Sequence, residues 1–280
     1  RGSHGSTMVA ANLGGFQGMH DQVGTEFPGF HHVQQPHWFD FGGDMTPEEF
    51  GLAAAAEVEK KILEVGPDNV AAFIGEPIQG AGGVLIPPST YWPEVQRICR
   101  KYGVLIISDE VICGFGRTGN WWGFETMGFE PDIVPMAKGL SSGYLPIGAV
   151  AFADHLLKDF FELGGEFYHG MTYAGHPVAC AVALKNIEII EQEKLVQHTA
   201  EIGPYFAQAL ASLRDHPIVG ETRSMGLIGA IELSNDKARR SRFASPGRVG
   251  TMCRDNSFKH GLIMRACWDT MVLAPPLVIT

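Results

Sequence analysis

The apolar run Val104-Leu105-Ile106-Ile107 leads directly into the polar residues Ser108-Asp109-Glu110. A short, unbroken run of apolar and β-branched residues is typical of a strand that is buried in a parallel sheet. In an open α/β sheet, ligands bind outside the carboxyl ends of the strands. The sequence therefore predicts a strand over residues 104–107 and a candidate binding residue, Asp109, just after it.

Strand and helix patterns alternate on both sides of this run. Thr46-Pro47-Glu48-Glu49 combines a capping threonine, a proline at the first helical position and acidic residues in the first turn, which together predict a helix start. Alternation of this kind is typical of right-handed βαβ units, so we expect an α/β fold with a mainly parallel sheet. The expected strands are 70–74 (buried), 104–107, 132–136 and 148–152, and the expected helices are 47–65, 91–102, 177–192 and 195–214.

The pattern changes after about residue 217. Short apolar runs at 227–233, 262–265 and 271–273 predict strands around a helix at 246–260, as in a smaller α+β domain. We therefore expect a large domain over residues 1–216 and part of a smaller carboxyl-terminal domain over residues 217–280.

Composition narrows the classes of partner and compartment. The 280 residues include 31 acidic and 21 basic side chains, a formal net charge of −10, which argues against nucleic acid or an anionic membrane surface as the main partner. No apolar run reaches the roughly 18 residues of a membrane span. The five cysteines are odd in number and include no CxxC pair, so we expect no disulfide framework, no metal site and a cytoplasmic location.

Three charged residues follow expected strands: Glu76, Asp109 and Lys138. No other charged residue lies within Met136-Ala137-Lys138-Gly139-Leu140-Ser141, and a lysine in such surroundings becomes a nucleophile toward aldehydes more readily. Pyridoxal phosphate needs a lysine for a Schiff base and an anion that keeps its ring nitrogen protonated. Lys138 and Asp109 together suggest this cofactor, although spacing alone leaves open a capping or salt-bridge role for Asp109 and a solvated role for Lys138.

Four motifs carry a resemblance to a known family. They are Glu76-Pro77-Ile78-Gln79-Gly80; Ser108-Asp109-Glu110-Val111 with Gly114-Phe115-Gly116-Arg117-Thr118-Gly119; Ala137-Lys138-Gly139-Leu140; and His169-Gly170-Met171-Thr172-Tyr173-Ala174-Gly175-His176-Pro177. In this order and spacing the chain resembles the class III, pyridoxal-phosphate-dependent aminotransferases of fold type I, over essentially its whole length. Within that family it is most similar to the ω-amine–pyruvate branch, which includes putrescine–pyruvate aminotransferases.

The resemblance implies a role for each matched residue. Lys138 would hold the cofactor covalently and later transfer the proton, and Asp109 would pair with the pyridine nitrogen. Val111 would pack on one face of the ring. Thr172 would donate a hydrogen bond to the cofactor phosphate of the neighbouring subunit, which implies a homodimer with shared active sites.

Three features depart from the family pattern. Members that act on ornithine or γ-aminobutyrate carry a glutamate and an arginine that pair with each other, where this chain has Ala81 and Val272. Arg265 stands where the amine–pyruvate branch has a mobile arginine that can bind a keto-acid carboxylate, and the alternative is a surface arginine at a strand end. Ser3 stands just before the His4-Gly5 pair, where the family usually has an aromatic residue that stacks on the cofactor. Either the stacking is weakened or this short stretch is altered.

The resemblance implies a ping-pong aminotransferase. An amine or diamine would give its nitrogen to the cofactor, and pyruvate or another keto acid would then take it. A decarboxylase or aminomutase on the same fold remains an alternative, because fold does not fix the reaction. A non-catalytic fragment that binds a partner chain is the other, since the family has further segments before the first motif and after the last.

Overall fold

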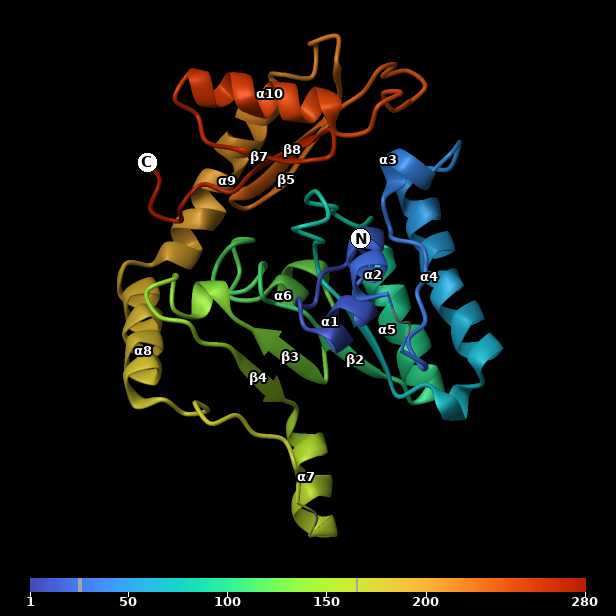
Figure 1. The fold of residues 1–280 in the computed structure, drawn as a ribbon, viewed down its shortest axis with the longest axis vertical. Helices are drawn as coiled ribbons and strands as arrows, with labels where there is room; N and C mark the ends of the chain where they lie inside the picture. Colours follow the sequence, from blue (N-terminus) through green and yellow to red (C-terminus); the bar gives the residue numbers. More distant parts are fainter. Residues whose placement is uncertain (25–26, 165) are drawn as a thin grey trace.

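The strands of the chain form two separate sheets (Figure 1). The computed structural model describes residues 1–24, 27–164 and 166–280, and both sheets lie within these ranges. The first sheet contains β1 (Ala72–Gly75), β2 (Leu105–Ser108), β3 (Ile133–Met136) and β4 (Ala149–Phe152), and the second contains β5 (Val219–Met225), β6 (Ile228–Leu233), β7 (Arg265–Cys267) and β8 (Thr270–Leu273). The helices are α1 (Met8–Leu13), α2 (Gln17–Val23), α3 (Trp38–Phe41), α4 (Pro47–Val65), α5 (Tyr91–Tyr102), α6 (Gly123–Met127), α7 (Asp154–Leu163), α8 (Pro177–Gln192), α9 (Leu195–Ala211) and α10 (Arg248–Lys259), with 3₁₀ turns η1 (Pro67–Asn69) and η2 (Lys138–Leu140).

The first sheet has the strand order β1-β2-β3-β4 and is mainly parallel, as the sequence predicts. β1 pairs with β2 and β2 with β3 in parallel, whereas β4 runs antiparallel to β3. The register sets Gly75 opposite Ser108. The residues that follow β1, β2 and β3 therefore emerge at the same edge of the sheet.

Helices α4 and α5 pack together beside β1 and β2 (Figure 1). α4 begins with the expected cap: the Thr46 hydroxyl accepts a hydrogen bond from the Glu49 N–H at 3.2 Å, and the Glu49 carboxylate accepts one from the Thr46 N–H at 2.9 Å. This reciprocal pair satisfies two backbone groups that the first turn leaves without partners. The core between these helices and the strands includes Trp92, whose ring stacks on Phe129 with centroids 4.0 Å apart.

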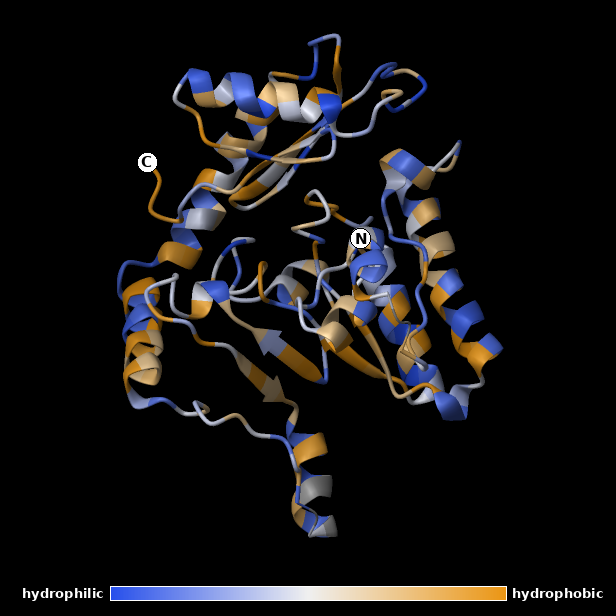
Figure 2. Cartoon of the chain, viewed as in Figure 1, coloured by the Kyte–Doolittle hydropathy of each residue, from blue (hydrophilic) through white to orange (hydrophobic). Residues whose placement is uncertain are grey.

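Burial along the first sheet is uneven. β1, which the sequence predicts to be buried, is half-buried, and all four residues of β4 are exposed. Figure 2 shows that β3 and β4 carry mainly apolar residues. The prediction of strands at these positions is confirmed, but the expected burial of β1 is wrong for this chain, because Phe73 is the one β1 residue that packs against a hydrophobic cluster in the described structure.

The second sheet has the order β5-β6-β8-β7 and is antiparallel throughout. α9 packs against β5 and β6, and α10 packs against β7 and β8. All six residues of β6 are buried. The sheet begins two residues after the expected start of the second domain, whose proposed limits remain 217–280.

The sequence misplaced one strand here and missed another. The strand predicted at 262–265 is wrong: β7 begins at Arg265, and Leu262 and Ile263 are exposed in the loop that follows α10. An apolar run alone does not say where pairing starts, and β8 provides partners only from Arg265 onward. β5 was not predicted, because its sequence VGETRSM mixes polar and small residues and contains no apolar run.

A buried charge network joins the second sheet to the loop that follows β1. Arg223 of β5 donates hydrogen bonds to the carbonyls of Gly83 and Val84, each at 2.7 Å, and to Glu232 at 2.8 Å. Glu232 is fully buried and also pairs with Arg242. Burial opposes its ionisation, but the two guanidinium groups outweigh that effect and hold the pKa of Glu232 below its ordinary value. The network therefore ties the two sheets together.

Candidate active site

Asp109 lies just after β2, at the edge of the sheet where the parallel strands end. Its N–H donates to the Gly75 carbonyl at 2.9 Å, which continues the pairing of β1 with β2. Its side chain is buried, with Oδ1 accepting from the Val111 N–H at 3.0 Å and Oδ2 lying 2.7 Å from Nδ1 of His4. One oxygen thus caps the following turn, as the simpler alternative proposed, and the other reaches a histidine. Both contacts fix the direction of the carboxylate.

His4 is a site residue that the sequence did not reveal. The side chains of His4 and Asp109 are 6% and 5% exposed, so their contact is shielded from water. The Ser3 N–H donates to Oε1 of Glu76 at 2.9 Å, so residues 3 and 4 lie across the ends of β1 and β2. The His4-Gly5 pair was visible in the sequence, but no local pattern indicates a partner 105 residues away.

Glu76 follows β1 and has an unusual acidity. Its Oε1 accepts the hydrogen bond from Ser3, and its Oε2 accepts one from the Gly80 N–H at 2.8 Å. Burial raises the pKa of Glu76 to about 7, against the two N–H donors, and the nearby charge of Asp109 adds to the rise. Glu76 therefore titrates near neutral pH, next to the Asp109 carboxylate.

Glu110 is a second buried carboxyl at this edge, but its hydrogen bonds run to Ser108 and to the start of α6. It accepts hydrogen bonds from the Ser108 hydroxyl at 3.0 Å and from the N–H groups of Gly123 and Phe124, both at 2.8 Å. Burial raises its pKa to about 7 despite these donors. Its contacts anchor the start of α6, so we assign it a structural role.

Lys138 follows β3 and begins the 3₁₀ turn η2. Its φ is +37°, in the left-handed region that costs a residue with a side chain roughly 1–2 kcal/mol. Its side chain is exposed. The structure thus places Lys138 and Asp109 after the neighbouring strands β3 and β2, as the sequence predicts, although the two side chains form no hydrogen bond with each other in the described structure.

The other predicted cofactor ligands are placed differently. Val111 is half-buried and lies beside Asp109, and Ser3 is half-buried and lies beside Glu76. Thr172 is exposed in the segment between α7 and α8, which Figure 1 shows leading away from the ends of β1 to β3. The structure therefore gathers Ser3, Asp109 and Val111 but not Thr172, and the individual roles of these residues stay predictions.

Arg265 is exposed at the start of β7, where it lies directly across from Val272 of β8. Two residues further along, the Cys267 thiol donates to the carbonyl of Ala81 at 3.3 Å. Burial raises the pKa of Cys267, although the positive charge of Arg265 opposes the rise. Of the two positions where the gate residues are missing, Val272 therefore lies in the hairpin that carries Arg265, and Ala81 lies beside that hairpin.

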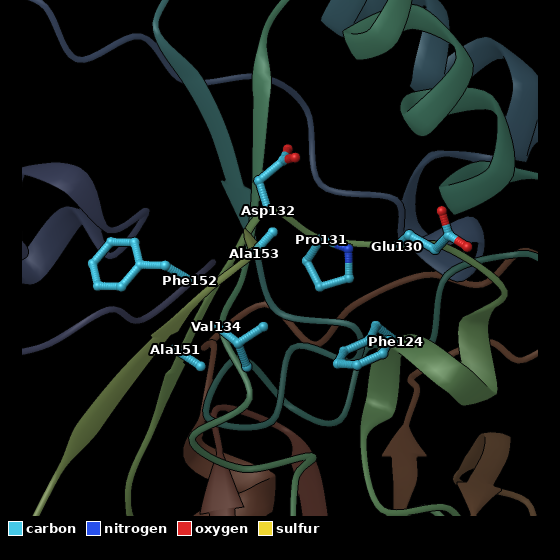
Figure 3. A pocket seen from close by; sticks show the side chains of 8 residues that line it. All are labelled: Phe124, Glu130, Pro131, Asp132, Val134, Ala151, Phe152 and Ala153. Atoms are coloured by element: carbon cyan, nitrogen blue, oxygen red, sulfur yellow. The ribbon is translucent and has the colours of Figure 1, made fainter. Parts of the chain in front are cut away.

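A cavity of about 320 Å³ lies at the opposite edge of the first sheet (Figure 3). It is bordered by the residues before β3 and after β4, and Figure 3 shows the carboxylates of Glu130 and Asp132 near apolar side chains. It is lined by Phe124, Glu130, Pro131, Asp132, Val134, Ala151, Phe152 and Ala153. Because Lys138 follows the other end of β3, this cavity is separate from the candidate site. Among the described residues, no group of three or more histidine, cysteine, aspartate or glutamate side chains could hold a metal ion.

The residues at the strand ends fit pyridoxal phosphate. Lys138 offers an exposed amine, Asp109 a fixed carboxylate, and Val111 a half-buried apolar surface. Oε1 of Gln79, in the loop after β1, is buried with no hydrogen-bond partner. An unpaired buried polar atom is costly, so a ligand that donates a hydrogen bond would satisfy it. These side chains could hold the ring and aldehyde of the cofactor.

Comparison with known proteins agrees with this geometry. The family model described as aminotransferase class-III matches residues 1–280. The chain belongs to the class-III aminotransferases. The fold type I architecture expected of this class-III aminotransferase is also found in solved relatives. The ω-transaminase of Pseudomonas jessenii in complex with PMP has a TM-score of 0.96 and 44% identity, and the match covers 100% of this chain and 62% of that one.

Curated relatives of this class-III aminotransferase fall into several branches. A putrescine–pyruvate aminotransferase of Pseudomonas aeruginosa is 54% identical over 279 residues, which cover 99% of this chain and 61% of the relative. A diaminobutyrate–2-oxoglutarate transaminase of Halomonas elongata is 40% identical, over 100% of this chain and 62% of the relative. The chain thus spans about three fifths of the length of these relatives.

Proposed function

We propose that the whole protein transfers an amino group from a small amine or diamine to pyruvate or another keto acid, with pyridoxal phosphate as cofactor. The observation that carries the proposal is the placement of Asp109 and Lys138 at neighbouring strand ends, with the Asp109 carboxylate fixed by His4. The similarity to a putrescine–pyruvate aminotransferase supports the same donor and acceptor classes. When bound, the cofactor supplies an aldehyde that accepts the amino group and a ring that takes up the electrons released at the substrate carbon.

In this proposal Asp109 stabilises positive charge on the ring nitrogen. Its carboxylate is buried and already oriented by the Val111 N–H and by His4, so no reorganisation is needed during the reaction. The contact with His4 occupies one lone pair of Oδ2 and leaves others for the cofactor. His4 is thus a positioning residue that acts through Asp109.

Lys138 serves as nucleophile and then as proton carrier. Its Nζ would hold the cofactor through the aldehyde carbon, with loss of water. Once free, the same amine would accept the proton from the substrate carbon that bears the nitrogen and carry it during the transfer. The exposed side chain of Lys138 leaves room for this exchange.

Arg265 would select the acceptor. Its guanidinium can bind a keto-acid carboxylate through two parallel hydrogen bonds. Because it is exposed and has Val272 rather than a carboxylate across the hairpin, no ion pair with that position would hold it in place when an amine without a carboxylate enters. A fixed glutamate–arginine pair would hinder that movement, and Ala81 and Val272 remove both members.

A homodimer with shared active sites is part of the proposal. Phe161, Tyr168 and Tyr173 are each more than 80% exposed. Exposed apolar surface of this kind marks an interaction site, and Thr172 lies within the same segment. A second copy that covers this surface would bring Thr172 toward the cofactor phosphate of its partner.

We propose a cytoplasmic location. All five cysteines are unpaired, and a reducing compartment keeps thiols in that state. Within the described residues, none of the helices is both long enough and apolar enough to cross a bilayer.

The proposal is tested by trapping and by product analysis in the full-length protein. Reduction with borohydride in the presence of pyridoxal phosphate should label the peptide that contains Lys138, and Lys138→Ala should lower alanine formation from putrescine and pyruvate by about 10²–10⁴-fold or more. Lys185→Ala, which removes an exposed lysine of α8, is the matched control and should stay near wild type. A label on another lysine would end the assignment. CO₂ release from an added amino acid, with no alanine formed from putrescine and pyruvate, would indicate a decarboxylase.

A further inference from the structure

Asn186 of α8 makes a close contact with the turn that carries Lys138. Its side-chain amide nitrogen lies 2.8 Å from the Gly139 carbonyl and 3.2 Å from the Leu140 carbonyl. One NH₂ group has two donors, so it can serve both carbonyls at once. The last carbonyls of a helical turn have no partner within it, and Asn186 supplies the donors that η2 lacks.

The place of Asn186 on its helix is itself informative. Ala183 and Ile190 are buried in one cluster with Leu140, and Ile187 packs against this cluster. Residues 183, 186, 187 and 190 follow the spacing of a single helix face. Asn186 is thus a polar residue on the apolar face of α8, and its amide is directed at the backbone of η2.

The turn needs such support because its conformation is unfavourable. Lys138 has φ +37° and Ser142 has φ +50°, both in the left-handed region. A Cβ on Gly139 would lie 2.9 Å from Cβ of Phe115, so Gly139 packs tightly on this buried side chain. The backbone of Phe115 is also in the left-handed region, with φ +60°. Strained backbone persists only where its surroundings over-determine it, and it concentrates at functional sites.

We propose that Asn186 is a positioning residue that holds Lys138 in its left-handed conformation and so fixes where the Lys138 amine lies. The inference rests on the proposed function of Lys138 as the residue that bonds to the cofactor. Without the two hydrogen bonds, the turn relaxes toward an ordinary backbone conformation, and the Lys138 amine moves away from the place where it meets the cofactor aldehyde. Asn186 therefore acts only through Lys138.

A double-mutant cycle on cofactor affinity tests this in the full-length apoenzyme. Asn186→Ala should weaken binding of pyridoxal phosphate about tenfold when Lys138 is present, equivalent to about 1.4 kcal/mol. In the Lys138→Ala background the same change should alter affinity less than twofold, because the residue through which Asn186 acts is gone. Equal losses of affinity in both backgrounds would mean that Asn186 has a merely structural role. An unchanged affinity of Asn186→Ala when Lys138 is present would also overturn the proposal.

Two further measurements keep the outcome clear. Asn186→Asp preserves size but donates no hydrogen bond at neutral pH, so it should weaken binding at least as much and serves if the alanine variant does not fold. Lys185→Ala, next to it on α8, should leave the affinity unchanged. Borohydride labelling of wild type decides separately whether Lys138 bonds to the cofactor, so failure of the proposed function and failure of this inference are told apart.

Discussion

The carboxylate of Asp109 is held by contacts that an amide of the same shape would keep. In Asp109→Asn, Oδ1 can still accept from the Val111 N–H, and the amide NH₂ can donate to Nδ1 of His4 in its other tautomer. What changes is the negative charge that the proposed function places next to the ring nitrogen. The Asp109→Asn substitution therefore removes the charge and keeps the hydrogen bonds that orient the side chain.

We expect Asp109→Asn to retain the fold and to lose about 10²–10³-fold in turnover, because a preoriented charge is removed from a buried site. Thermal unfolding of the apoenzyme and the turnover of the loaded enzyme are the measurements. A large fall in the unfolding temperature with turnover per folded molecule near wild type would mean that Asp109 acts only as a cap.

Glu76 gives a prediction for pH. Its pKa is about 7 in the folded chain and near the ordinary 4.5 when unfolded. Between these values the folded state binds the extra proton, so the contribution of Glu76 to stability is present below about pH 4.5 and is lost as pH rises through 7. The free energy of unfolding of Glu76→Gln relative to wild type should therefore increase by about 3 kcal/mol from pH 5 to pH 8. Thermal unfolding of both proteins at each pH measures this difference. Glu57→Gln, at an exposed position of α4, should show no such trend.

Arg265→Ala should separate the two half-reactions. Loss of a bidentate, charge-assisted contact of about 3 kcal/mol predicts a fall of roughly 100-fold in kcat/KM for pyruvate. The amine half-reaction should fall by about threefold or less, since no carboxylate is bound there. Stopped-flow measurement of each half-reaction in the full-length enzyme makes the comparison. Similar losses in both would reduce Arg265 to a structural residue.

Among single residues, the sequence predicted those whose chemistry is local. Lys138 and Asp109 each follow an apolar run, so strand ends alone located them. The contact of His4 with Asp109 spans 105 residues, and that of Asn186 with η2 spans 47. No local sequence pattern around His4 or Asn186 indicates which residue it contacts. Such residues become visible only when the chain is folded.

Among helices and strands, prediction succeeded where the local signals were strong. The helices predicted at 91–102 and 177–192 have those bounds in the structure, since glycine ends the first and a proline begins the second. The short helices α1, α2, α3, α6 and α7 were not predicted, because their limits depend on contacts rather than on a long apolar repeat.

The contact of α10 with the β7–β8 hairpin depends on one glycine. A Cβ on Gly250 would lie 2.0 Å from the carbonyl oxygen of Trp268, which is backbone and cannot rotate away. The N–H of Gly250 also donates to the buried Asp269 carboxylate at 2.9 Å. Both contacts fix how closely the helix approaches the hairpin.

Gly250→Ala should therefore push α10 away from the hairpin and lower stability by about 1–3 kcal/mol, as for overpacked cores. Thermal unfolding of the full-length apoenzyme measures the effect. Thr251→Ala, at the next and exposed position of α10, should change stability by no more than about 0.5 kcal/mol. Helix propensity alone would raise the stability of both variants, so an unchanged or higher unfolding temperature of Gly250→Ala would contradict the role of the close approach.

The whole molecule presents exposed aromatic side chains around α7 and the segment before α8. If a second copy covers this surface, Tyr168→Glu should shift the full-length enzyme from dimer toward monomer in sedimentation velocity. It should also weaken cofactor binding, because the proposed dimer would supply Thr172 across the interface. Tyr205→Glu, which changes a similarly exposed tyrosine on α9, is the control and should leave the dimer intact. A dimer that tolerates Tyr168→Glu would place the interface elsewhere.

The position of Val272 across from Arg265 imposes an order on evolution toward the charged gate of other branches. An arginine introduced first at position 272 would set two guanidinium groups side by side on neighbouring strands. A glutamate introduced first at position 81 would lie beside the same hairpin, where the Ala81 carbonyl meets Cys267, and could pair with Arg265. One route begins with a harmful step and the other does not, so the two substitutions show sign epistasis. We expect Val272→Arg alone to lower the unfolding temperature and Ala81→Glu alone to leave it unchanged. Measuring both single variants shows which substitution can come first.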